Sequence, residues 1–117
     1  MILDLMCIPM TKEKETDDYV WYKIEVRAKT DKFEIDKRGR KIAICKNLYG
    51  TFRFKKESYN YTNQNDFKIE NHIVFIDQET DSVLLTQKND ILIRCLVVMG
   101  KHLKEGSFPE KTMLATG

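Results

Sequence analysis

The sequence predicts an α+β domain in which one C-terminal helix packs on a face of a mainly antiparallel sheet of five to seven strands. Apolar and polar residues alternate over Tyr19–Ala28 and again over Tyr49–Lys55, which is the period of half-buried strands. From Asn89 onward the apolar residues instead recur at helical spacing, and Gly106 follows them as a left-handed stop. Strands followed by a single helix are typical of a helix packed on an antiparallel sheet.

Length and composition favour one domain over residues 1–117. The chain is 42% apolar and 32% charged, with only five Gly and two Pro, a composition typical of an ordered domain of common size. Residues 1–9 are apolar but lack a basic leader, so they predict a first strand rather than a signal peptide. Cys7, Cys45 and Cys95 are odd in number and lie among apolar neighbours, which predicts buried free thiols in a reducing compartment. We therefore expect a cytoplasmic protein with no membrane segment.

A hairpin is predicted between the two alternating strands. Its two strands are Phe33–Asp36 and Lys41–Lys46, and Gly39 supplies the positive φ that a tight turn often requires. In the strand that follows, Phe52 and Phe54 point toward the core because they share one parity.

The middle of the chain predicts a loop and a second hairpin. Polar residues over Glu57–Asp66 favour a loop, and Phe67–Ile76 favours a strand or a bent pair of strands. Gln78–Asp81 fits the turn of the second hairpin, with His72–Ile76 entering it and Ser82–Thr86 leaving.

The C-terminal helix is predicted to begin at Asn89 or Asp90, either of which can cap it. Its apolar face holds Leu92, Cys95, Leu96, Met99 and Leu103. The alternative is a strand over Ile91–Met99, since β-branched residues are abundant there and Gly100 could end it. We favour the helix because the cap, the basic last turn and Gly106 agree with one another.

No residue spacing commits the chain to catalysis or to a metal. His72 and His102 lie thirty positions apart, and no Cys lies two to four positions from a His or another Cys. Cys45 and Cys95 are in apolar segments, where thiols usually pack inertly, and His102 is expected to flank the core or cap the helix. We therefore expect a protein that is not an enzyme and has no cofactor or metal.

The charge distribution is most uneven over residues 37–56, which hold eight Lys or Arg and no acid. The 36 residues before this basic segment carry nine acids against six bases, as do the 61 after it. A partner with negative charge is therefore expected. The candidate partner-binding residues are Lys37, Arg38, Arg40, Lys41, Tyr49, Arg53 and Lys55.

The basic segment has two interpretations. In the first, the cations of the hairpin lie next to Arg53, Lys55 and Lys56, with Tyr49, Tyr59 and Tyr61 available to stack, a surface suited to an acidic protein or to single-stranded nucleic acid. In the second, the lysines only keep strand edges soluble. A protein partner is favoured over nucleic acid because the pI is 8.4 and acids gather between positions 13 and 18. Those acids, or the ones between positions 77 and 81, are the alternative contact surface.

The final segment is an amphipathic helix followed by a glycine stop at Gly106 and by Phe108-Pro109-Glu110. It resembles the tail of small bacterial immunity proteins, which neutralise a cognate toxin by tight binding. The resemblance implies a cytoplasmic inhibitor that occludes a toxin domain by shape and charge. The alternatives are a small nucleic-acid-binding domain that uses residues 37–56 and a minor enzyme or accessory subunit. Charge reversal by Lys37→Glu with Arg40→Glu separates the first two. It should weaken nucleic-acid binding strongly, whereas with a protein it should mainly slow association and leave the affinity in high salt, unless those residues lie at the buried centre of the interface.

Overall fold

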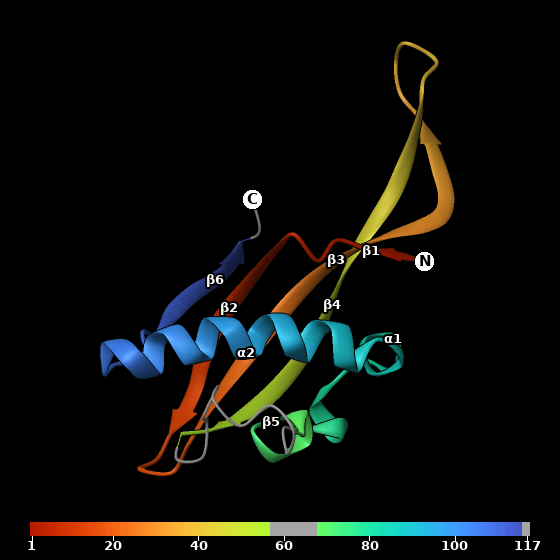
Figure 1. The fold of residues 1–117 in the computed structure, drawn as a ribbon. Coiled ribbons are helices and arrows are strands. Elements are labelled where there is room, and N and C mark those ends of the chain that lie inside the picture. The colour runs from red at the N-terminus through yellow and green to blue at the C-terminus, as the bar shows by residue number, and fades with distance from the viewer. Residues whose placement is uncertain (57–67, 116–117) are drawn as a thin grey trace.

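One antiparallel sheet organises the chain. The structure, a computed structural model, describes residues 1–56 and 68–115. Within them the strands are β1 (Ile2–Leu3), β2 (Cys7–Glu15), β3 (Tyr19–Ile35), β4 (Lys41–Lys55), β5 (Ile73–Phe75) and β6 (Lys111–Ala115). Their order is β5-β4-β3-β2-β6, and β1 pairs with β3. Helix α2 (Lys88–Glu105) crosses one face of this sheet (Figure 1), so the predicted α+β class is confirmed.

The core lies between this helix and the sheet. Alternation along β3 and β4 turns the predicted apolar parity inward, and the fully buried Tyr22 and Phe52 are opposite each other with ring centroids 5.9 Å apart. Phe54 is also fully buried, as the alternation predicted. The helix contributes Ile91, Leu92, Cys95, Leu96 and Met99. One contiguous apolar cluster joins the two layers.

Strands β3 and β4 form a single long hairpin. The predicted hairpin is its outer end, and Gly39 has the expected positive φ of 78° at the turn. Pairing runs without a break from Tyr19 to Lys29 and then shifts register before Phe33. Sequence periodicity divided this hairpin into separate pieces because the alternation fades where the strands leave the core.

The predicted second hairpin is wrong. Strand β5 is only three residues long, and Ser82–Thr86 forms a short helix, α1, rather than a returning strand. Asp81 caps it, since its carboxylate accepts the N–H of Val83 at 2.9 Å. Gly50 lets this segment approach β4 closely, because a Cβ there would come within 2.9 Å of the Thr80 methyl group. The loop expected over Glu57–Asp66 lies outside the described residues.

Helix α2 confirms the helical interpretation, and the alternative strand over Ile91–Met99 is wrong. Its N-cap is Gln87 instead of the expected Asn89 or Asp90, and Gln87 makes no side-chain capping bond. Gly106 ends the helix with a φ of 79°, and its N–H bonds the carbonyls of the last turn. The glycine stop is therefore confirmed.

The two outer strands on the β2 side differ most from expectation. Strand β2 extends through Glu13 and Glu15, two of the exposed acids that form the alternative contact surface. Strand β6 was not expected, and it pairs antiparallel with β2 so that Leu114 lies opposite Ile8. Five residues at the end of a chain give too short a pattern to predict a strand.

The three cysteines are free but not equally buried. Cys95 lies in the core, Cys45 is half-buried and Cys7 is exposed. Burial raises the pKa of the Cys95 thiol to about 12. The expectation of three buried thiols is therefore correct only for Cys95, because Cys7 is on the outward parity of β2.

We expect thiol labelling to follow this order. An excess of a maleimide at pH 7.5 should modify Cys7 first, Cys45 more slowly and Cys95 only with unfolding, because the thiolate is the reactive species and access limits it. Mass spectrometry over a time course measures the order, and Cys7→Ser is the control. Early labelling of Cys95 would contradict the burial of α2 against the sheet.

Candidate functional site

The outer end of the β3–β4 hairpin projects from the body of the protein (Figure 1). We call residues 30–45 the arm. None of residues 29–47 is buried, although β3 and β4 continue through most of this stretch. The radius of gyration is 16.3 Å, whereas a compact chain of this length has about 13 Å. The arm therefore adds extended surface rather than core.

Large apolar side chains are exposed along the arm. The exposed fractions of Phe33, Ile35 and Ile42 are 59%, 64% and 50%. Phe33 lies opposite Ala43 and Ile35 opposite Lys41, while Ile42 lies opposite Glu34. Because directly paired residues share a face, Ile42 is on the other face from Phe33 and Ile35. Each face of the arm thus carries exposed apolar side chains beside charged ones, Lys41 on the face of Phe33 and Glu34 on the face of Ile42. The exposed Ile2 of β1 extends the apolar surface at the base of the arm.

The tip of the arm is charged and ordered by Asp36. One carboxylate oxygen of Asp36 accepts the N–H groups of Arg38 and Arg40, each at 2.8 Å, and the other accepts Nε of Arg40 at 2.8 Å. These bonds hold the pKa of Asp36 below its usual range, and the bond from the Arg40 backbone N–H makes the largest contribution. Among the described side chains, Lys37 and Arg38 pair with no carboxylate. The turn therefore presents two unpaired cations on a fixed backbone.

The predicted site residues do not form one patch. Lys37, Arg38, Arg40 and Lys41 are at the arm tip, whereas Tyr49, Arg53 and Lys55 lie toward the other end of β4. The fifteen residues of β4 separate its two ends by more than about 40 Å at about 3.3 Å per residue. The expectation that Arg53 and Lys55 lie beside the hairpin cations is therefore wrong. Tyr59 and Tyr61 lie outside the described residues.

A second surface lies on the outward parity of β3 and β4, on the face of the sheet opposite α2. Three aromatic rings there each have a cation above them: Arg53 over Tyr19 at 4.5 Å, Lys14 over Trp21 at 4.9 Å and Lys23 over Tyr49 at 5.0 Å. We call this set the aromatic row. Part of it lines a hollow of about 540 Å³ together with Glu13 and Glu79. The hollow is thus of mixed charge.

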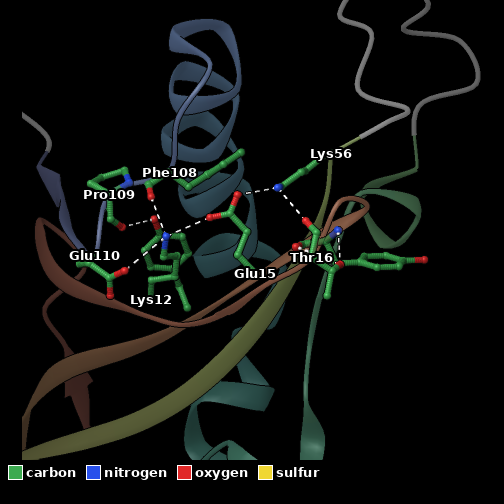
Figure 2. Close-up of polar contacts among 9 residues, drawn as sticks. Lys12, Glu15, Thr16, Lys56, Phe108, Pro109 and Glu110 are labelled. Carbon is green, nitrogen blue, oxygen red and sulfur yellow. Dashed lines mark hydrogen bonds and ion pairs between the residues drawn. The ribbon is translucent and has the colours of Figure 1, made fainter.

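A polar cluster ties the segment after α2 to the sheet (Figure 2). Glu15 accepts hydrogen bonds from Lys12 at 2.9 Å and from Lys56 at 2.6 Å. Lys12 also donates to the carbonyl of Phe108 at 3.0 Å and pairs with Glu110 at 3.4 Å. The Tyr22 hydroxyl, whose pKa burial raises to about 12, donates to the carbonyl of Pro109. Lys56, within the basic segment, therefore has a structural contact.

Glu15 should make stability depend on pH. Its hydrogen bonds with Lys56 and Lys12 lower its pKa in the folded state, so its contribution is present above the unfolded value of about 4.3 and is lost as pH falls through the folded value. We expect the free energy of unfolding to fall as pH drops below about 5, and Glu15→Gln to reduce that slope. Urea titrations between pH 3 and 7 measure both, and an unchanged slope would contradict the role of Glu15.

No three His, Cys, Asp or Glu side chains within 1–56 and 68–115 are grouped so that they could hold a metal ion. His102 is 9% exposed and its Nε2 lies 2.9 Å from Thr112 Oγ1, so the prediction that it flanks the core is confirmed. In the same part of the chain, no helix is both long and apolar enough to cross a membrane.

Comparisons of the chain with protein-family models, curated proteins and solved structures gave no match. The function of the chain is therefore inferred from its own residues. Sequence reasoning located the cations of the arm but missed Phe33, Ile35 and Ile42 as exposed residues, because apolar residues in a strand are usually assigned to the core. The register set by the turn could have indicated their exposure, because it places Ile42 on the opposite face from Phe33 and Ile35, so one core cannot bury all three.

Proposed function

We propose that this chain is a non-enzymatic protein that binds another protein through the arm, most concretely an immunity protein that blocks a toxin domain. The observation that carries the proposal is the exposure of Phe33, Ile35 and Ile42 beside the unpaired cations of an ordered turn. Exposed apolar side chains with a charged rim are typical of protein interfaces.

The arm contributes little to the stability of the fold. It buries no residue, so it adds little to stability, and its apolar side chains remain in water. Binding a partner would bury these side chains and supply the free energy that folding does not gain from them. An ordered tip also lowers the entropy lost on association.

The resemblance to immunity proteins supports the choice of an inhibitor over other binding proteins. The residues that carry it stabilise the fold: Phe108 is 8% exposed, and Glu110 pairs with Lys12. They therefore help to attach the segment after α2 to the sheet, while the arm supplies the contacts with the partner. A small protein that projects a hairpin can occlude an active site without any chemistry of its own.

Affinity capture tests the proposal. The tagged chain is incubated with a lysate of the source cell and washed with up to 0.5 M salt, and the bound protein and nucleic acid are identified. One stoichiometric protein should survive the wash and should be lost with Phe33→Ser and Ile35→Ser. The matched control is Ile93→Ser with Val97→Ser, which changes exposed apolar residues of α2 that are 52% and 60% exposed. Loss of the partner with the control alone would overturn the role of the arm.

The second candidate function is binding of single-stranded nucleic acid. The aromatic row favours it, since aromatic rings interleaved with cations are what stacked bases and phosphates require. Against it, each ring already has a cation above it and acids line the hollow. Trp21 is the single tryptophan of the chain, so titration with a 20-nucleotide oligo(dT) tests this function through its fluorescence. Saturable quenching that weakens with salt would favour nucleic-acid binding, and the absence of quenching would exclude this second candidate function.

A further inference from the structure

We infer that the arm enters a protein cleft whose walls cover its exposed apolar side chains and whose floor carries carboxylates, such as the substrate cleft of an enzyme with catalytic Asp or Glu residues. The inference rests on the proposed function, and it adds the chemistry of the partner. It follows from three features of the arm: exposed apolar side chains on both of its faces, the position of the cations and the order at the tip.

Exposed apolar side chains on both faces of the arm favour a cleft over a flat surface. A flat partner would cover either Phe33 with Ile35 or Ile42, because these residues lie on opposite faces of the hairpin. A cleft would contact both faces at once and bury all three side chains, which are each at least half exposed. A partner that buries all three apolar side chains must therefore surround the arm.

The order of residues along the arm gives the polarity of that cleft. The apolar side chains lie on the strands, whereas Lys37 and Arg38 lie beyond them at the turn. When the arm enters tip first, these two cations reach the deepest point and need anionic partners there, since a buried unpaired charge is strongly unfavourable. A lipid bilayer fits poorly, because its interior would receive a charged tip.

The anionic groups that a protein can supply at such a floor are Asp and Glu carboxylates. Paired carboxylates in a cleft are the working groups of glycoside hydrolases, and carboxylates hold the metal ions of many hydrolases. Cations on the arm would pair with these carboxylates while the arm excludes the substrate. Arg40 would not take part directly through its Nε, because that atom is bonded to Asp36.

Zero-length cross-linking of the captured complex tests this inference. A carbodiimide joins an amine to a carboxylate in contact with it, so the Lys37 amine should form an amide with an Asp or Glu in the substrate cleft of the partner, identified by peptide mass spectrometry. Lys37→Arg is the matched control: it keeps the positive charge and should keep the partner but lose the product. Failure to cross-link in a stoichiometric complex would overturn the inference and leave the proposed function standing.

Salt dependence gives a second, independent measurement on the same complex. Lys37→Glu with Arg38→Glu should reduce affinity at least about 10-fold, and the loss should persist at 0.5 M salt because contacts at a buried floor are poorly screened. A loss that disappears at 0.5 M salt would place the cations at a solvated rim and overturn the inference. If the affinity capture yields no stoichiometric protein, or only RNA or lipid, the proposed function fails as well.

Discussion

Replacing Phe33 and Ile35 by Ser should lower the affinity for the partner by more than about 100-fold while leaving the fold intact. Each is a large apolar side chain that is exposed in the free protein and that binding would bury, and such anchors contribute about 1–3 kcal/mol each. At about 1.4 kcal/mol per factor of ten, two anchors near the middle of this range lower the affinity by roughly 10³-fold together. Isothermal titration calorimetry with the captured partner measures the change.

The control for this expectation is stability. Because neither side chain is buried in the free chain, the free energy of unfolding of the double variant should stay within about 0.5 kcal/mol of the original. An affinity that is unchanged, with a folded variant, would show that the partner contacts another surface. Equal losses of affinity and stability would instead mean that the arm packs on the body.

Phe52→Ala should destabilise the protein by about 3–5 kcal/mol, the range for removing a fully buried aromatic side chain. Phe52 is 0% exposed, stacks on Tyr22 and lies opposite Phe75 of β5. Its loss would leave a cavity where two strand pairs meet. Urea unfolding followed by the fluorescence of Trp21 measures the effect.

Phe33→Ala is the matched control, since it removes the same side chain from a position that is 59% exposed. It should change the free energy of unfolding by about 0.5 kcal/mol or less. Similar losses from the two substitutions would contradict the division of the hairpin into a buried part and a projecting arm. The pair thus separates folding from binding within one hairpin.

Periodicity predicted the parts of the fold that face the core. The alternation in Tyr19–Ala28 and Tyr49–Lys55 identified the buried sides of β3 and β4, and helical spacing with Gly106 identified α2. It failed where another interaction decided the conformation. Asp81 capped a helix over residues that were expected to form a strand, and β6 depends on pairing with β2, which no local pattern records.

Charge density predicted the arm cations but not their arrangement. The basic segment is continuous in sequence, yet an extended strand carries Lys41 and Lys55 to opposite ends of the hairpin. Lys56 has a structural contact with Glu15, so one of the eight cations helps to hold the fold. The exposed apolar residues, which carry the functional proposal, were recognised only from the structure, because the sequence alone does not show that no other element within residues 1–56 and 68–115 covers them.

The most direct test of the arm as the binding surface is amide hydrogen exchange of the chain, free and in complex with its captured partner. We expect added protection over residues 30–45 and no change over residues 19–25 and 49–55, which carry most of the aromatic row. Protection over the aromatic row with an unchanged arm would contradict the proposal and assign binding to the open face of the sheet.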